Sequence, residues 1–519
     1  MINPHSPTGT LIIGGGHNGL VCAAYLARAG RKVTILEAAD RPGGAAITRE
    51  FAAGFRVSAG AHLLYLLDEG IRKDLRLDAH GLKLARQDLD TVSLDAGGQH
   101  VRISGDQVHG VSGADQAALR EYQRLMGRFA GLIGTLHGRP PPRLGTTARQ
   151  DLLPLARLGW DIRRLGRKDM REFLRLAGIN VFDLLQELFE SELLKGALSL
   201  DGTLGSFLGP RSNNSVFCAL HRMSGGNRYS IPAGGMGAVT GAMAAAAQAA
   251  GATLRTGARV QRLLMDFDRV VGVELEGGEQ ITADTVVSSA DPKTTFLKLL
   301  GARHLEAGFA HRVSNIRCTG HAAKLHLALD GLPEFTGLEP ALAGERLLIA
   351  PSLQYVEHAF NPAKYGKYPA QPVLEITLPS VHDASLAAAG QHVLSAIVQW
   401  APHGLKAGWD TARAAFYETV LGTLEQYAPG IRGQIRHAEL LTPADIEAEF
   451  GITGGHWHHG ELSLDQFLML RPVPGAAQYA APVKGLWLCG AGSHPGGGVM
   501  GCAGRNAAQA ILGNGGPGQ

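Results

Sequence analysis

Three glycines near the start of the chain have the spacing of a dinucleotide-binding turn. Gly14, Gly16 and Gly19 follow directly on the apolar run 11–13. In such a turn the first glycine permits a sharp bend, the second lets the backbone approach a pyrophosphate, and the third lets a helix pack close to the strand. The pyrophosphate then lies at the helix N-terminus, where unpaired N–H groups and the helix dipole favour an anion. The chemistry indicated is dinucleotide binding without a basic residue in the loop.

A glutamate supports the same interpretation. Glu37 closes a second predicted strand, 32–36, and stands 23 positions after Gly14. A carboxylate in this place accepts hydrogen bonds from the two ribose hydroxyls of an adenosine, which disfavours a 2′-phosphate. The elements that must hold both groups are the first strand, a helix over 20–29 and the second strand. We therefore expect a strand–helix–strand unit at the start of the fold.

Further glycine-rich segments carry a resemblance to a known family. One is the Arg-Pro-Gly-Gly-Ala-Ala turn at 41–46, and another is the loop 490–499, which follows the apolar run 485–490. The other matching segments are 189–195, 233–238, 463–466 and 471–474. Together they span nearly the whole chain. The sequence resembles the phytoene-desaturase-like flavoproteins. Among these flavoproteins it most resembles the group called pyridine nucleotide-disulfide oxidoreductase domain-containing protein 2.

The resemblance implies FAD as the cofactor and an α/β fold, in which a Rossmann-type FAD-binding domain carries an inserted α+β substrate domain, as in amine oxidases and phytoene desaturases. In these flavoproteins the final loop lays a helix N-terminus against the flavin ring, where its positive end stabilises the reduced anion. The residues that the motifs place at the cofactor are Gly14, Gly16, His17, Asn18, Gly19, Glu37, Ala38, Arg41, Gly43, Gly44, Ala45, Ala61, Val260, Ala290, Gly490, Ala491, Gly498, Val499 and Met500.

The FAD domain is expected to consist of separated pieces with two insertions between them. The expected units are FAD-binding pieces at 8–105, 223–301 and 479–512, a helical insertion facing substrate or membrane at 106–222, a substrate domain at 302–478 and a flexible tail at 513–519. Alternating apolar and polar residues at 323–329 and 372–378 predict an antiparallel sheet in the substrate domain. We expect this sheet to form a wall over the flavin, with a helix over 408–427 behind it.

Histidines are the candidate catalytic groups. His62 follows the turn 58–61, and His456, His458 and His459 share one short loop. Flavin oxidation moves a hydride from substrate carbon to flavin N5, and desaturation also removes a neighbouring proton, so a neutral histidine could be the base. The alternatives are packing or flavin contact for His62 and a structural loop for the others. No metal is expected, because no further ligand cluster accompanies these residues.

We expect an FAD-dependent oxidoreductase that removes a hydride from a C–H bond of an apolar substrate. The expected class is a desaturase or dehydrogenase reoxidised by oxygen or a quinone. The segment Ser-Ala-Gly-Ala at 58–61 departs from the Asp-x-Gly-Pro of carotenoid desaturases, which argues against phytoene itself. Two alternatives stay open. One is a flavin amine oxidase, although neither a flavin-facing lysine nor an aromatic cage is recognisable, and the other is a non-enzymatic carrier resembling the Rab escort and GDP-dissociation-inhibitor proteins.

The composition of the chain argues against several other classes of protein. The 519 residues are 45% hydrophobic and 18% charged with a net charge of +3, which fits a globular protein and gives no indication of nucleic-acid binding. The five cysteines form no C-x-x-C, so a redox-active disulfide has no candidate, and no second Rossmann motif for NADPH occurs. Residues 1–5 lack the charged and apolar regions of a signal peptide.

These features predict a cytoplasmic protein. A basic amphipathic segment at 155–175 could bring the chain to an anionic membrane as a peripheral protein, or could be a solvated helix face. The sequence does not indicate the oligomeric state.

Overall fold

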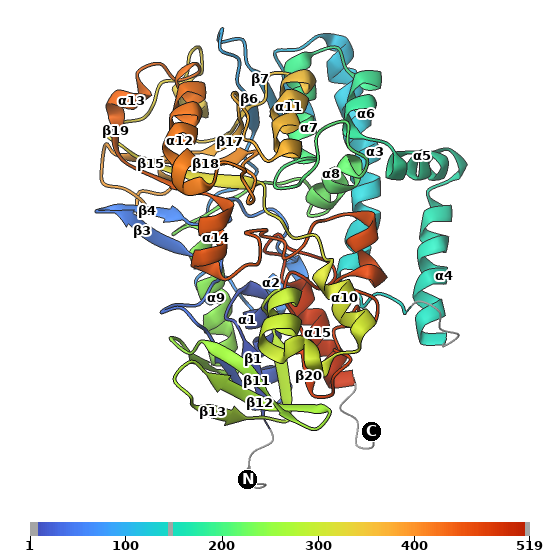
Figure 1. Ribbon diagram of the computed structural model, residues 1–519. Helices are drawn as coiled ribbons and strands as arrows, with labels where there is room; N and C mark the ends of the chain where they lie inside the picture. Colours follow the sequence, from blue (N-terminus) through green and yellow to red (C-terminus); the bar gives the residue numbers. More distant parts are fainter. Residues whose placement is uncertain (1–8, 144–148, 514–519) are drawn as a thin grey trace.

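The computed structural model describes residues 9–143 and 149–513 of the chain (Figure 1). Its lower part is built on a five-stranded parallel sheet in the order β10-β2-β1-β14-β20. The strands are β1 (Thr10–Ile13), β2 (Val33–Leu36), β10 (Thr253–Arg255), β14 (Thr285–Ser288) and β20 (Leu486–Leu488). This mixed α/β arrangement confirms the predicted Rossmann-type fold. The flexible tail expected at 513–519 lies outside the described residues from 514 onward.

The strands of this sheet are apolar on both sides because each side is covered. Ile12 of β1 packs in one core with helices α1 (His17–Arg28), α9 (Met236–Ala249) and α15 (Cys502–Gly513). Leu11 and Ile13 pack in another core with the antiparallel strands of a second sheet. These strands are β11 (Val260–Asp266), β12 (Arg269–Leu275) and β13 (Gln280–Thr282). Successive side chains of a strand point to opposite faces, so β1 contributes to both cores.

The upper part of the molecule contains an eight-stranded sheet in the order β19-β15-β18-β17-β16-β6-β7-β8 (Figure 1). Its strands are β6 (Thr91–Ser93), β7 (Val101–Ser104), β8 (Gln107–His109), β15 (Ala322–Leu329), β16 (Arg346–Ile349), β17 (Val373–Thr377), β18 (His392–Gln399) and β19 (Ile435–Leu441). All neighbours in it are antiparallel except β16 and β6. The antiparallel sheet predicted from the alternating segments is therefore present.

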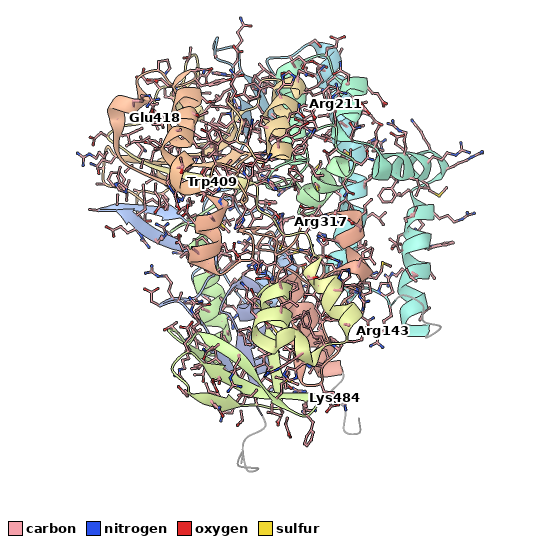
Figure 2. All side chains as sticks on the ribbon, viewed as in Figure 1. Arg143, Arg211, Arg317, Trp409, Glu418 and Lys484 are labelled. Carbon is pink, nitrogen blue, oxygen red and sulfur yellow. The ribbon has the colours of Figure 1, made fainter. Side chains whose placement is uncertain are left out.

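The two faces of this sheet differ in polarity. Leu325 and Leu394 belong to the apolar face, which packs against Phe416 of α12 (Trp409–Glu425). Trp409, labelled in Figure 2, begins this helix, which is the one expected over 408–427. The opposite face carries buried polar side chains, among them Lys324 and Glu375. A buried polar face needs partners on another element, and here it faces the cofactor half of the molecule.

The sheet also takes in strands that the expected limits assign elsewhere. Thr91 of β6 pairs with Arg346 of β16, and β7 and β8 extend the same sheet to His109. The expected first FAD-binding piece, 8–105, included β6 and β7, and the expected helical insertion, 106–222, included β8. Strand membership is decided by long-range pairing rather than by order in the chain, so the domain limits themselves stay a prediction.

The helical insertion contains α3 (Gly113–His137), α4 (Arg149–Arg164), α5 (Arg167–Gly178), α6 (Val181–Leu188), α7 (Glu192–Asp201) and α8 (Ser215–Met223). Most of these helices share one apolar core. Helices α4 and α5 lie at the edge of the molecule, beyond α3 and α8 (Figure 1).

Shorter elements connect these layers. They are β3 (Thr48–Ala52), β4 (Phe55–Ser58), α2 (Glu69–Asp74), β5 (Leu84–Arg86), β9 (Ile231–Pro232), α10 (Ala307–Ser314), α11 (Leu353–Phe360), α13 (Ile431–Gln434) and α14 (Pro443–Phe450). Across the residues that the structure describes, no helix combines the length and the apolar character needed to span a bilayer.

Candidate active site

The three glycines of the first turn meet three different steric demands. Gly14 has φ +91°, a left-handed conformation that glycine adopts without strain. A Cβ at Gly16 would project into open space, which leaves the backbone accessible to a ligand. A Cβ at Gly19 would overlap the carbonyl oxygen of Gly14, so only glycine lets α1 pack this close to the turn. The geometry matches the roles inferred from the spacing.

Polar groups around this turn lack partners among the described residues. Gly16 is the N-cap of α1 and supplies no side-chain cap. Nε2 of His17 and both amide atoms of Asn18 are buried without a hydrogen bond. Burial, and secondarily His459, lowers the pKa of His17 to about 4, so its ring is neutral. Since buried polar groups are normally satisfied, this end of the fold fits a polar ligand such as the diphosphate of FAD.

Glu37 is held by the backbone. The N–H of Gly15 donates to its Oε2 at 2.6 Å and the N–H of Ala39 donates to its Oε1 at 2.8 Å. A carboxylate offers about four acceptor positions, and these bonds use two of them. The carboxylate also lines the cleft described next. It is therefore fixed in place with acceptor capacity left for two ribose hydroxyls.

A cleft runs from the glycine turn to the eight-stranded sheet. The predicted cofactor residues that line it are Gly14, Gly16, His17, Asn18, Glu37, Ala38, Gly43, Gly44, Ala45, Ala61, Val260, Ala290, Ala491, Gly498 and Val499. These residues come from all three sequence regions that the motifs identified. Their convergence on one cleft is the arrangement that a split FAD site would have.

Four predicted cofactor residues do not line the cleft. Like Gly19, Gly490 has a packing role, because a Cβ there would overlap the backbone of Ser289. Met500 is buried in the core, and Arg41 is half exposed and pairs with Asp40 at 3.0 Å. Direct contact of these four residues with the cofactor stays a prediction.

Apolar and charged side chains together form the end of the cleft at the eight-stranded sheet. Leu204, Trp457 and Ile397 line it, along with Arg222 and Glu375. Glu375 and Ile397 are register partners on β17 and β18, so their side chains point to the same face of the sheet. The sequence did not single out any of these five residues, because their distant segments meet only in the fold.

Glu375 is the centre of a buried ionic network. Its Oε2 accepts hydrogen bonds from Arg222 Nη2 at 2.7 Å and from Arg346 Nε at 2.6 Å, and Arg346 Nη2 also reaches Asp201 at 2.6 Å. Burial alone would raise the pKa of Glu375, but the two guanidinium groups hold it well below its usual range. The two arginines and two carboxylates compensate one another, so this network adds no net charge to the cleft.

His62 joins this network and lines the cleft. Its Nε2 lies 3.1 Å from Glu375 Oε1, and its Nδ1 lies 3.4 Å from Thr377 Oγ1. Burial, followed by the nearby Lys324, lowers the pKa of His62 to about 4 despite the carboxylate. The ring is therefore neutral at pH 7, the state that a general base requires.

The loop histidines divide into two groups. His458 and His459 line the cleft, whereas His456 lies behind His458 with ring centroids 5.8 Å apart. Burial lowers the pKa of all three, that of His456 to about 3. The structure thus brings His62, His458 and His459 to the cleft and leaves His456 outside it. Within 9–143 and 149–513, no group of three or more His, Cys, Asp or Glu side chains has a metal-binding arrangement.

A buried lysine was missed by the sequence analysis. Lys324 of β15 is the register partner of Ile397, and its Nζ has no hydrogen-bond partner among the described residues. Burial lowers its pKa to about 7. The sequence feature that could have indicated it is a lysine at an inward position of the alternating run 323–329. Lys324 places an amine that can be neutral on the same face of the sheet as Glu375.

Comparison with known proteins identifies the class. The chain matches the family described as flavin containing amine oxidoreductase over residues 19–355, and it belongs to that family. It is an FAD-dependent oxidoreductase. It is 35% identical to pyridine nucleotide-disulfide oxidoreductase domain-containing protein 2 of Rattus norvegicus, over 97% of this chain and 93% of that protein. These findings confirm the family and cofactor expected from the sequence.

Two further likenesses are more distant. The chain is 26% identical to a component of the limonene dehydrogenase of Castellaniella defragrans, over 96% of this chain and 94% of that protein. The solved structure of wild-type putrescine oxidase bound to putrescine matches with a TM-score of 0.62 at 15% identity, covering 98% of both chains. At this identity the structural match shows the fold alone.

Proposed function

We propose that this FAD-dependent oxidoreductase removes a hydride and a neighbouring proton from an apolar organic molecule and leaves a carbon–carbon double bond. Bound FAD would take the hydride, with its electron pair, at flavin N5, and oxygen or a quinone would then reoxidise it. The protein must hold an apolar molecule, exclude water and accept one proton. The relative from Castellaniella defragrans supports this choice, because the name limonene dehydrogenase denotes a hydrocarbon substrate.

The observation that carries this proposal is the character of the cleft at the eight-stranded sheet. Leu204, Ile397 and Trp457 offer apolar surface, while Arg222 and Glu375 neutralise each other. Burial of apolar substrate surface supplies binding free energy without a specific polar partner. A substrate rich in C–H bonds fits such surroundings.

His62 is the proposed proton acceptor. It is neutral, lines the cleft and has Glu375 on its Nε2. The carboxylate would stabilise the imidazolium formed when His62 takes a proton, as acidic partners of histidine bases do. Lys324, with a pKa of about 7, is close enough to weaken His62 as a base when it is protonated.

An amine substrate is the second candidate, because the family description names amine oxidoreductases. An ammonium group would need an uncompensated acceptor at the reacting end of the cleft. Glu375 is already bonded to two arginines, and Asp291 accepts hydrogen bonds from Thr294 and from Thr453 Oγ1 at 2.8 Å. The charge of Glu375 is thus compensated by the arginines, whereas Asp291 meets only neutral donors among the described residues; the compensation of Glu375 favours the apolar substrate.

Anaerobic substrate screening tests the proposal. The yellow holoenzyme is mixed with a panel of cyclic and acyclic isoprenoid hydrocarbons and with a matched panel of primary and secondary amines, and flavin bleaching is followed. We expect bleaching by a member of the hydrocarbon panel and a product two hydrogens lighter by mass spectrometry. Bleaching by amines alone would establish the amine oxidase alternative. Reoxidation is then compared between oxygen and a soluble quinone.

We also propose that α4 and α5 bring the enzyme to an anionic membrane surface, where an apolar substrate would collect. Leu153, Arg157, Trp160 and Arg164 follow one another at spacings of four, three and four, so they share one face of α4. Leu153 is 67% exposed and Trp160 is 60% exposed. Apolar and cationic side chains on one exposed face are typical of an interfacial helix.

A further inference from the structure

Arg471 is a fully buried guanidinium that pairs with no carboxylate among the described residues. It is 2% exposed, and its hydrogen bonds go to backbone carbonyls only. The acceptors are the carbonyl oxygens of His458 at 2.6 Å, Ala491 at 2.8 Å, Glu461 at 3.1 Å, Gln466 at 3.3 Å and Gly460 at 3.3 Å. Arg317, labelled in Figure 2, engages the neighbouring carboxylates of Glu461 and Asp465. The charge of Arg471 is therefore left uncompensated.

The other buried arginines of the site behave differently. Arg222 and Arg346 both bond to Glu375, and Arg346 also pairs with Asp201. Burying an ion without a partner costs several kcal/mol, so folded proteins rarely keep one. Burial lowers the pKa of Arg471 to about 10, which still leaves it charged at pH 7. A buried, unpaired charge that persists calls for a negative partner from outside the chain.

The location of Arg471 indicates that partner. Two of its acceptors are the carbonyl oxygens of His458 and Ala491. Both residues line the cleft, so the charge lies directly behind the cleft wall. It also helps to lower the pKa of His456, His458 and His494. These imidazoles remain neutral and add no positive charge of their own. Arg471 thus supplies an uncompensated positive charge at this part of the cleft.

We propose that Arg471, through its fixed positive charge, raises the reduction potential of the bound flavin. Two-electron reduction with uptake of one proton leaves one negative charge on the flavin ring, and a fixed positive charge in a low-dielectric site stabilises it. The carbonyl bonds hold the guanidinium behind the loop 490–499 and the histidine loop. This inference depends on FAD as cofactor and not on the identity of the substrate.

The test measures the midpoint potential of purified holoenzyme by chemical reduction against a reference dye. Three variants separate charge from shape: Arg471→Lys keeps a cation, Arg471→Gln keeps donors to the carbonyls without charge, and Arg471→Met keeps neither. The matched control is Arg317→Met, which removes an arginine from the same region that is 48% exposed and paired with carboxylates. No substrate is needed, so failure to find a substrate leaves this experiment unaffected.

We expect the potential of Arg471→Gln and Arg471→Met to fall by at least about 30 mV, the equivalent of a tenfold change for a two-electron couple. Arg471→Lys and Arg317→Met should stay near wild type. If Arg471→Met fails to retain FAD, the Gln and Lys variants decide the outcome. A wild-type potential in Arg471→Gln overturns the proposal. Weaker binding of ADP by Arg471→Gln, with an unchanged potential, also overturns it. The charge would then stabilise the diphosphate of the cofactor instead of the flavin ring.

Discussion

Nε2 of His62 lies 3.1 Å from Oε1 of Glu375, and the same carboxylate is bonded to Arg222 and Arg346. The histidine therefore meets a carboxylate whose charge is already compensated, which is why burial still lowers its pKa to about 4. A base of this kind stays neutral over the physiological range. It becomes charged only when a substrate proton is transferred to it, and Glu375 then stabilises the product.

Replacing His62 with alanine should slow flavin reduction by a bound substrate by about 100-fold or more, the usual contribution of a general base. Rapid-reaction absorbance under anaerobic conditions measures this rate. His456→Ala is the matched control, because His456 is buried in the same region but does not line the cleft. An unchanged rate in His62→Ala removes it as the base.

Replacing Lys324 with methionine should raise the pKa of His62. Below pH 7 the Lys324 amine is protonated, and its charge is the second largest cause that lowers the pKa of His62. Flavin reduction is lost as the pH falls through the pKa of the base, so this acid limb should move to higher pH in Lys324→Met. The pH profile of the reduction rate measures it, and Lys364→Met, which removes a lysine whose side chain is 42% exposed, is the control. A limb that stays in place, or moves to lower pH, contradicts the coupling.

Replacing Glu37 with alanine should weaken FAD binding at least tenfold. The carboxylate is fixed by two backbone N–H groups, and a hydrogen bond to a charged acceptor contributes about 1.5–3 kcal/mol. Fluorescence titration of the deflavinated protein with FAD gives the affinity. Glu50→Ala, which removes an exposed turn carboxylate, should bind FAD normally. Equal affinity in both variants would rule out the ribose role.

The cofactor half of the fold could be predicted because its signals are local. The turn at Gly14, the strand 33–36 and Glu37 follow one another in sequence and make their own contacts. The substrate half could not, because Arg222 and Glu375 are 153 positions apart and meet only when a helix packs against the sheet. Arg41 has the type and spacing expected of a cofactor ligand, yet in the structure it pairs with its neighbour Asp40. Spacing predicts which backbone approaches a ligand better than where a long side chain points.

Stability should fall steeply with acidification below about pH 6.5. Several buried histidines have pKa values lowered from 6.5 in the unfolded chain: His17, His62, His221, His321 and His494 to about 4 and His456 to about 3. Between these values the unfolded state binds more protons, so stability rises with pH and is lost as pH falls toward 4. Each histidine contributes about 1.4 kcal/mol per pH unit in this window.

Denaturant unfolding of the holoenzyme between pH 7.5 and 5 measures this slope. His321→Gln removes one titrating group and should make the slope shallower, whereas His109→Gln, at an exposed position, should leave it unchanged. Stability that is flat between pH 7 and 5 would mean that these rings are not buried as the structure has them.

Replacing Leu153 and Trp160 together with serine should abolish binding to anionic vesicles while leaving flavin content unchanged. Both side chains lie on the exposed face of α4, and each apolar group removed from the interface weakens binding in proportion to its area. Sedimentation with vesicles of phosphatidylglycerol and phosphatidylcholine is the measurement, and vesicles of phosphatidylcholine alone should bind weakly because the arginines of α4 need anionic lipid. Phe267→Ser is the matched control, since Phe267 is 94% exposed on the distant β11–β12 hairpin. If the double variant sediments like wild type, the exposed face of α4 does not contact the membrane, and a concentration-dependent change in mass would assign it to a second copy of the chain.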